Sequence, residues 1–244
     1  MIQSALRRFL RRLGGHLTQG LAQKKDVDDL YDMVAGLLQI QSGLAGGPLL
    51  KPLRGWVISP DAMAWMLADL QERTAPTIVE FGAGQSTVIF ALWLKNRGAG
   101  KVISFEHDPA HADAIRRQLE ASGAADWVDL RIVPLVDYPA VGSLPACQSY
   151  ALTDLPDLPI DLALVDGPPY WFGASCRYPP LNWAVSRLAT SGTLYLDDTA
   201  RPAERGVLRQ LSAAWPGVVV DDLRAEKGLA RCTKGTAIAP GPRP

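Results

Sequence analysis

The sequence of 244 residues has few cysteines and no long uninterrupted apolar segment. Cys147, Cys176 and Cys232 lie far apart and form no C-x-x-C motif, which excludes a disulfide scaffold and a cysteine-ligated zinc site. No apolar run approaches the roughly 20 residues that span a bilayer. The N-terminal arginines lie within the apolar pattern rather than ahead of it, unlike those of a secretory signal. We therefore expect a cytoplasmic protein.

The sequence also lacks an excess of either charge, since 25 lysines and arginines balance 25 aspartates and glutamates. The distribution is uneven, because residues 1–25 contain six basic residues and no acid, whereas the remainder carries a net charge of −6. An acidic body is poorly suited to following a phosphate backbone, so a nucleic-acid partner is not expected. Apolar residues make up 48% of the chain, which predicts a large buried core.

Residues 1–55 are expected to form an N-terminal helical extension with a basic amphipathic start. Over residues 2–13, apolar residues fall on one helical face and four arginines on the opposite face. Such a helix can lie on an anionic membrane as a peripheral contact. It can equally pack on its own domain with a solvated basic face. The sequence leaves both alternatives open, and it predicts a second helix over residues 26–40.

From residue 77 onward, short apolar strands alternate with helices. Strands are predicted over 77–81, 101–106, 128–134, 160–166 and 193–197, and helices over 60–73, 86–95, 110–122, 181–189 and 202–214. This alternation predicts an α/β fold with a Rossmann-like, doubly wound, mostly parallel sheet. No strand is assigned to the proline-interrupted residues 137–159.

The end of the chain follows a different pattern. Two apolar runs over 217–223 and 229–233, joined by a short turn, predict a C-terminal hairpin that adds an antiparallel strand to the sheet edge. Residues 56–235 are accordingly expected to form the main domain. The residues from 236 to 244 are rich in proline and glycine and are expected to be a disordered tail.

The first predicted strand ends in a glycine-rich turn. In an open parallel sheet, ligands bind beyond the carboxyl ends of the strands. Gly82 and Gly84 allow the backbone to turn tightly and to approach a ligand closely. A dinucleotide-binding G-x-G-x-x-G motif would need glycine at position 87, which is threonine, so a nicotinamide-dependent oxidoreductase is disfavoured. Glu106 ends the second strand, where it can accept hydrogen bonds from both hydroxyls of a ribose.

The segments VEFGAGQST, ISFEHD, LALVDGPP and LYLDD together resemble class I S-adenosylmethionine-dependent methyltransferases, over roughly residues 56–235. More narrowly, they are similar to small bacterial methyltransferases of unassigned substrate that carry E-F-G-x-G-x-S-T and D-G-P-P motifs. The resemblance implies S-adenosylmethionine as cofactor. The implied cofactor-binding residues are Gly82 and Gly84 at its methionine part, Glu80 at its ammonium group, Glu106 at its ribose and His107 beside its adenine, together with Ser86, Thr87 and Asp166. We expect His111, four residues after His107, to lie on the surface and not to share a metal site with it.

Three aspartates follow two neighbouring predicted strands, Asp166 after one and the pair Asp197 and Asp198 after the other. They are the candidate catalytic residues, and carboxylates at neighbouring strand ends are costly unless a cation neutralises them. The layout resembles catechol and macrocin O-methyltransferases, which implies Mg²⁺ on all three aspartates, holding the acceptor hydroxyls. Alternatively, the pair caps the next helix, Arg177 or Arg201 supplies the positive charge, and Asp166 alone accepts the proton. Because side chains alternate along a strand, the pair can face the same way only if the chain turns there.

The loop over residues 170–180 is rich in aromatic residues, and loops over strand ends commonly form acceptor pockets. Tyr170 and Arg177 are the candidate substrate-binding residues. Tyr170 also completes a sequence similar to the D-P-P-Y motif of amino methyltransferases, but Gly167 is inserted after the acid. We expect methyl transfer to an oxygen or nitrogen of a small-molecule or glycan-like acceptor. The alternatives are an amino methyltransferase of the D-P-P-Y type and a non-catalytic binding or scaffold protein on the same fold.

Overall fold

The structure is a computed structural model that describes residues 33, 34, 36–38, 40, 41 and 57–235. The described residues before position 42 are helical, as predicted for that part of the chain. The amphipathic helix predicted over 2–13 and the tail predicted over 236–244 lie outside the described residues. In the described part of the chain, every helix is too short or too polar to cross a membrane.

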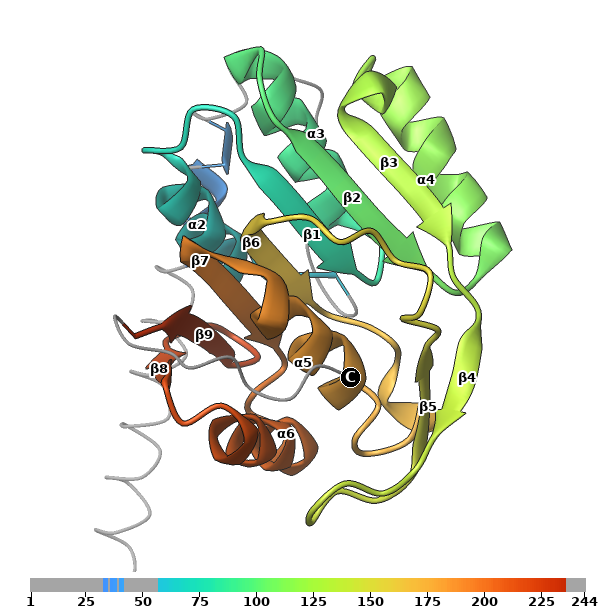
Figure 1. The fold of residues 1–244 in the computed structure, drawn as a ribbon. Helices are drawn as coiled ribbons and strands as arrows, with labels where there is room; N and C mark the ends of the chain where they lie inside the picture. The colour runs from blue at the N-terminus through green and yellow to red at the C-terminus, as the bar shows by residue number, and fades with distance from the viewer. Residues whose placement is uncertain (1–32, 35, 39, 42–56, 236–244) are drawn as a thin grey trace, which may run out of the picture.

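Seven strands form one mostly parallel sheet with the order β3-β2-β1-β6-β7-β9-β8 (Figure 1). The strands of this sheet are β1 (Thr77–Phe81), β2 (Lys101–Glu106), β3 (Val128–Ile132), β6 (Ile160–Val165), β7 (Leu188–Asp197), β8 (Val218–Leu223) and β9 (Leu229–Lys234). The first five in the spatial order are parallel, whereas β9 runs antiparallel to both β7 and β8. The predicted fold class, including the C-terminal antiparallel hairpin, is confirmed.

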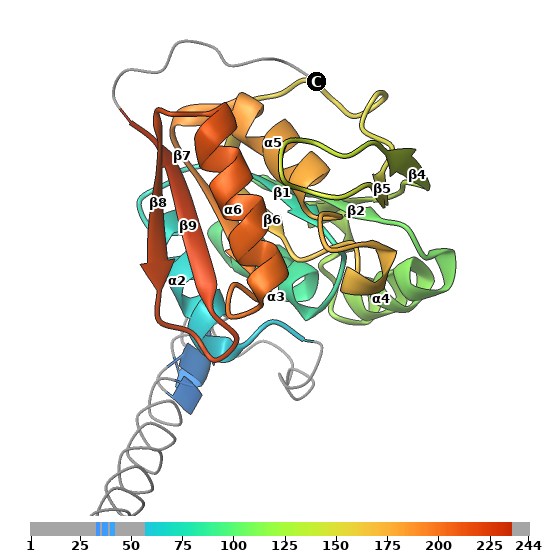
Figure 2. The ribbon, with the colours of Figure 1, turned by 90° about the horizontal axis from the view of Figure 1, so that it is seen from below.

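Helices cover both faces of the sheet (Figure 2). On one face, α2 (Pro60–Leu70), α3 (Gln85–Arg97) and α4 (Pro109–Ala121) bury their apolar sides. On the other face lie α5 (Tyr178–Arg187) and α6 (Pro202–Ala214). Four of these five helices carry proline in the first turn, where its missing N–H group costs no hydrogen bond. The chain reverses its winding direction between β1 and β6, which is where open α/β sheets bind ligands.

The assignment of no strand to residues 137–159 is wrong. A small hairpin of β4 (Leu135–Tyr138) and β5 (Cys147–Tyr150) enters this region and forms a separate two-stranded sheet. Each strand has only four residues and pairs with the other alone, so neither shows the long apolar run of a central strand. The hairpin nonetheless carries Tyr150 into the core on the α5 side of the sheet.

Several boundaries also differ from the prediction, and three of them have a clear physical reason. Strand β7 begins at Leu188, five residues early, because it continues directly from the end of α5. Helix α5 begins at Tyr178 rather than 181, since Pro179 and Pro180 fit its first turn. Strand β3 ends at Ile132, before Pro134, which has no N–H group to donate to a neighbouring strand.

Candidate active site

The two positions after β1 that hold glycine, 82 and 84, favour this residue for different structural reasons. Gly82 has a φ of +99°, and a side chain there would lie 3.0 Å from the backbone nitrogen of Gly167 in the segment after β6. Gly82 is therefore required by the fold itself. Gly84 is extended, and a Cβ there would meet nothing closer than the Ser86 hydroxyl at 3.7 Å. No described residue fills the space in front of Gly84, which leaves it open to a ligand.

The carboxylate of Glu80 lies beneath this loop and is fully buried. It accepts hydrogen bonds from three hydroxyl groups. The donors are Ser86, Thr87, at a distance of 2.5 Å, and Ser104, at a distance of 2.8 Å. Thr87 in turn accepts a hydrogen bond from the backbone N–H of Gly84 at 2.8 Å. The predicted role of Glu80 in orienting the cofactor ammonium group stays a prediction. Glu80 and Thr87 fix the turn that leads into α3, and Ser86 lines the adjoining cavity.

Replacing Glu80 with glutamine should make folding stability less dependent on pH. Burial raises the pKa of Glu80 from its ordinary value of 4.5 to about 7, so between these values the folded chain keeps a proton that the unfolded chain has lost. The stability of the wild-type protein should therefore fall by on the order of 3 kcal/mol between about pH 5 and pH 8. Urea unfolding at both pH values should show this fall in the wild type and a smaller one in Glu80→Gln. An equal fall in the two proteins would show that Glu80 is not the group responsible.

Glu106, at the end of β2, ties the next turn to the glycine loop. Its Oε1 accepts hydrogen bonds from the backbone N–H groups of His107 at 2.7 Å and Asp108 at 2.8 Å, and its Oε2 accepts one from Ala83 at 3.1 Å. The imidazole Nδ1 of His107 also lies 2.7 Å from Oε1. Both Glu106 and His107 line the cavity, and their assignment to the ribose and the adenine stays a prediction.

His111 has a role that the sequence prediction missed. It is exposed, as expected, but its Nε2 lies 2.8 Å from the carbonyl oxygen of Ala83 in the glycine loop, and its side chain lines the cavity. Helix α4 begins at Pro109, so His111 sits in its first turn and faces the loop. The spacing from His107 was visible in the sequence, but the position of the loop opposite α4 was not.

A cavity of about 630 Å³ opens over the carboxyl ends of β1, β2, β6 and β7. Its lining includes Gly82, Gly84, Ser86, Glu106, His107, His111, Tyr150, Asp166, Trp171, Arg177, Asp198, Arg201 and Lys227. Among the lining residues, Tyr150 from β5 and Lys227 from the turn before β9 did not enter the sequence prediction at all. No local motif marks them, because each comes from a segment that reaches the site only through the tertiary fold.

Tyr150 places a buried hydroxyl beside the segment after β6. Among the described residues its oxygen has no hydrogen-bond partner. A side chain at Gly167 would lie 2.5 Å from this oxygen, so the glycine that interrupts the D-P-P-Y-like sequence leaves room for the tyrosine. A buried hydroxyl without a protein partner is costly unless water or a bound molecule supplies the hydrogen bond, and Tyr150 lines the cavity.

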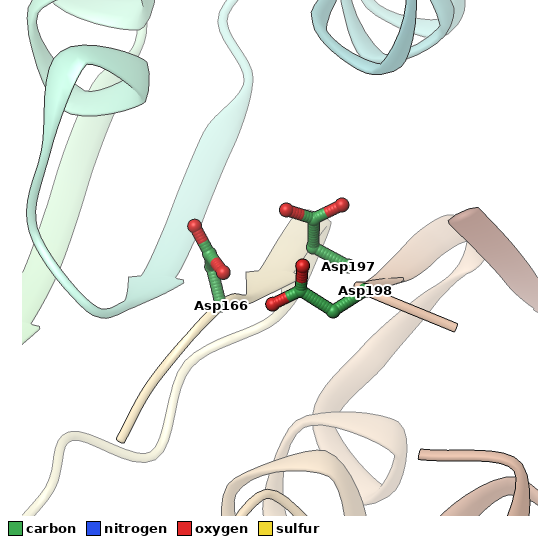
Figure 3. A group of neighbouring side chains, drawn as sticks. All are labelled: Asp166, Asp197 and Asp198. Atoms are coloured by element: carbon green, nitrogen blue, oxygen red, sulfur yellow. The ribbon is translucent and has the colours of Figure 1, made fainter. Parts of the chain in front are cut away.

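The three aspartates lie together, with one carboxylate oxygen of each within 4.8 Å of the others (Figure 3). Asp166 follows β6, Asp197 ends β7 and Asp198 comes next. The turn that the sequence required for both members of the pair to face one way is present, because Asp198 has a φ of +61°. Asp197 is fully buried and Asp198 nearly so, whereas the side chain of Asp166 keeps 17% of its surface exposed.

Three positively charged side chains surround these carboxylates. The guanidinium of Arg177, just before α5, lies 3.1 Å from Asp166 and 3.0 Å from Asp198. That of Arg201 lies 2.8 Å from Asp198. The ammonium group of Lys227 lies 3.5 Å from Asp197 and 4.0 Å from Asp198. Three positive groups thus face the three aspartates, and a further buried carboxylate, that of Glu204, lies 3.7 Å from Arg201.

The expectation that Arg177 or Arg201 neutralises the aspartates is confirmed. The alternative in which Asp197 and Asp198 cap the next helix is wrong. Helix α6 begins at Pro202 with Arg201 as its N-cap, and no side chain caps it. Asp198 supplies only its carbonyl oxygen, which accepts the backbone N–H of Arg201 at 2.9 Å. Its carboxylate instead points into the charged cluster, because the left-handed turn directs it away from the helix.

Burial raises the pKa of Asp166 well above its ordinary value, and the neighbouring carboxylates of Asp197 and Asp198 raise it further. Arg177 opposes both effects. The pKa of Asp197 is also raised, first by burial, while Lys227 lowers it. Of the two, only Asp166 lines the cavity.

Aromatic rings form one side of the cavity mouth. The short helix η2 (Tyr170–Phe172) carries Tyr170 and Trp171, which are 52% and 60% exposed. The ring of Phe172 meets that of His107 edge-on, with centroids 5.2 Å apart. Trp171 lines the cavity, whereas the predicted substrate residue Tyr170 stands beside it, under the guanidinium of Arg201. The other predicted substrate residue, Arg177, is buried within the aspartate cluster.

Solved structures with the same fold include several methyltransferases. The *Podospora anserina* methyltransferase PaMTH1, bound to SAH, is 16% identical, with a TM-score of 0.59 over 87% of this chain and 95% of that chain. The *Bacillus cereus* O-methyltransferase in complex with SAH is 19% identical, with a TM-score of 0.56 over 85% and 97%. TomG, the *Streptomyces achromogenes* O-methyltransferase involved in tomaymycin synthesis, is 18% identical, with a TM-score of 0.53 over 86% and 96%.

These likenesses establish the class I methyltransferase fold. No curated protein sequence matches the chain significantly. Residues 79–199, from β1 to just beyond β7, match the family model described as a methyltransferase domain. The chain therefore contains a methyltransferase domain and has the fold of class I S-adenosylmethionine-dependent methyltransferases.

Proposed function

We propose that the protein transfers a methyl group to an oxygen or nitrogen of a small-molecule or glycan-like acceptor. The observation that carries this proposal is the position of Asp166. Its carboxylate follows β6, lines the cavity and has a raised pKa, so it can take up the proton that the acceptor loses. The catalytic contribution of the chain is then to hold the acceptor in line with the methyl group and to remove one proton.

The residues around the cavity fit S-adenosylmethionine. The space in front of Gly84, the carboxylate of Glu106 and the unpartnered hydroxyl of Tyr150 all border the same cavity of about 630 Å³. When bound, the cofactor supplies an electrophilic methyl group on a positively charged sulfur. Glu106 offers the cofactor an acceptor oxygen, and Tyr150 offers a donor in a water-poor setting.

A hydroxyl acceptor fits the site better than the amine of a D-P-P-Y enzyme. In that motif, the acid and a carbonyl of the proline pair accept hydrogen bonds from the amine. Here the carbonyl oxygens of Pro168 and Pro169 face the buried thiol of Cys176 at 3.4 and 3.6 Å. The carbonyl oxygen of Asp166 accepts a hydrogen bond from Arg177 at 2.7 Å. The carbonyl of Asp166 is therefore already engaged by a charged donor, and the single thiol proton engages one of the two proline carbonyls.

The exposed rings of Tyr170 and Trp171 support an acceptor with a flat apolar face, such as a phenol or a sugar ring. Large apolar side chains exposed at the rim of a cavity commonly mark a binding surface. Aromatic rings offer such faces a broad contact area at a small loss of side-chain freedom. The adjacent Arg201 adds a positive charge at the same rim.

Mg²⁺ does not fit the residues that are present. Carboxylate oxygens are suitable ligands for this ion, and the three aspartates are close enough to share one. However, Arg177, Arg201 and Lys227 already balance their charge. No step of the proposed reaction is therefore derived through a metal ion.

Calorimetry with S-adenosylmethionine and S-adenosylhomocysteine tests the cofactor, and transfer of labelled methyl to a panel of phenols, catechols and sugars tests the acceptor class. We expect micromolar binding of both ligands and label on at least one hydroxyl acceptor. The absence of micromolar binding for either ligand would contradict the enzyme assignment. Binding without transfer to this panel or to cell extract would favour the alternative of a non-catalytic binding protein.

We also propose a cytoplasmic protein that contacts anionic membranes through residues 1–25. Six basic residues without an acid support this contact, as do the exposed side chains of Leu37 and Leu38 in the described helix nearby in sequence. Deleting residues 1–25 should reduce sedimentation with phosphatidylserine vesicles at low salt and leave cofactor affinity unchanged. Full-length protein that ignores such vesicles at low salt would contradict the membrane contact.

A further inference from the structure

The guanidinium of Arg177 lies at the centre of the aspartate cluster. Its Nη2 donates hydrogen bonds to the carboxylate of Asp166 at 3.1 Å and to the carbonyl oxygen of the same residue at 2.7 Å. The same nitrogen lies 3.0 Å from the carboxylate of Asp198, and Nη1 donates to the carbonyl oxygen of Asp197 at 3.1 Å. One side chain thus contacts all three aspartates through four oxygen atoms, two of them carboxylate and two carbonyl oxygens, while the carboxylate of Asp197 lies 3.5 Å from Lys227.

These four oxygens are the kind of ligand set that a hard divalent cation takes. From this arrangement we propose that Arg177 fills the place of a divalent cation among the three aspartates and positions Asp166 for a metal-independent methyl transfer. This inference rests on the proposed function only for the role of Asp166. The replacement of a metal by Arg177 stands on the contacts alone.

Burial explains why Arg177 and a metal ion exclude each other. Arg177 is only 4% exposed, so it cannot swing into solvent to make room without disturbing the start of α5. A divalent cation bound to the same oxygens would lie beside a buried guanidinium that has lost its partners. Separating a buried charge from its partners is strongly destabilising, so the arginine prevents the metal from binding.

Arg201 provides a matched control, because it contributes the same charge from a different position. It contacts Asp198 at 2.8 Å, but its side chain is 35% exposed, and it has no contact with Asp166 or Asp197 among the described ion pairs. Removing Arg201 lowers the charge of the cluster by one unit and leaves its centre occupied. Removing Arg177 lowers the charge equally and vacates the centre.

The experiment measures Mn²⁺ binding by electron paramagnetic resonance in the full-length wild type, Arg177→Met and Arg201→Met. Methionine has a length similar to that of arginine and no charge. Mn²⁺ takes the same oxygen ligands as Mg²⁺ and is directly detectable. We expect no binding in the wild type at millimolar Mn²⁺. Arg177→Met should bind Mn²⁺ at least about tenfold more tightly than Arg201→Met, because only the former frees the central position.

Two outcomes would overturn the inference. One is a wild type that binds Mn²⁺ in the micromolar range. The other is an Arg177→Met protein with native far-ultraviolet dichroism that binds Mn²⁺ no better than Arg201→Met. If Arg177→Met does not fold, Arg177→Gln takes its place, and the wild-type measurement still decides the first outcome. Both readouts are independent of cofactor binding, so failure of the proposed function would be recognised separately by calorimetry.

Discussion

Replacing Asp166 with asparagine should slow methyl transfer by about 10²- to 10⁴-fold, the range that a positioned general base contributes. Asparagine keeps the shape of the side chain and can still accept a hydrogen bond from Arg177, but it cannot take up a proton. The Kd for S-adenosylhomocysteine should therefore stay within about twofold of the wild-type value, since the fold around the cavity is retained. Single-turnover transfer of labelled methyl, together with calorimetry, measures the two effects.

The pH dependence of the same variant distinguishes a base from a structural residue. The pKa of Asp166 is raised by burial and by its carboxylate neighbours, so the wild-type rate should fall as the pH decreases through this raised pKa and the carboxylate becomes protonated. Asp166→Asn should lack this fall on the acid side. The slow rate should be the same with Mg²⁺ and with chelator. A variant that regains wild-type activity at any pH or metal concentration would exclude Asp166 as the base.

Replacing Gly84 with valine should weaken cofactor binding without unfolding the protein. The backbone at Gly84 is extended, and a Cβ there meets no described atom closer than 3.7 Å, so the protein itself tolerates a side chain. A ligand in the cavity does not. Overpacking of this kind costs about 1–3 kcal/mol, which is roughly a 5- to 150-fold rise in Kd. Calorimetry with S-adenosylhomocysteine measures the loss.

Gly82→Ala is the matched control for this experiment. At Gly82 the φ of +99° and the contact with Gly167 make any side chain unfavourable in the folded chain. We expect Gly82→Ala to lower the Tm, whereas Gly84→Val should leave it nearly unchanged. If Gly84→Val binds S-adenosylhomocysteine as tightly as the wild type, the glycine loop does not line the cofactor site.

The sequence predicted the structure best where polar residues directly follow a clear strand pattern. Strands β1 and β2 have the predicted bounds, because each is a short run of buried apolar residues between clear turns. Since parallel strands end at one edge of the sheet, the polar residues after them could be expected to meet, and Glu106, Asp166 and Asp198 do line one cavity. The roles of individual residues within the cofactor site remain predictions.

Other features depend on contacts that no local pattern encodes. Glu80 could be identified as an acid before the glycine loop, but its burial under three hydroxyls depends on Ser104 from the next strand. Tyr150 reaches the cavity only because of the small hairpin β4–β5, whose strands are too short to predict. Whether a metal ion or protein side chains neutralise the aspartates could not be decided from the sequence. One of the neutralising side chains, Lys227, is separated from its aspartate partners by about 30 residues of chain.

The position of Lys227 also bears on the order in which the site is completed during synthesis. The three aspartates, Arg177 and Arg201 all precede α6, whereas Lys227 lies in the turn between the last two strands of the sheet. A nascent chain that has not yet released this turn carries a buried aspartate, Asp197, without its nearest positive charge. Burying such a charge without its partner is unfavourable, so the cluster should close only when the final hairpin pairs with β7. Docking of the edge strands and assembly of the reaction centre thus become a single folding event.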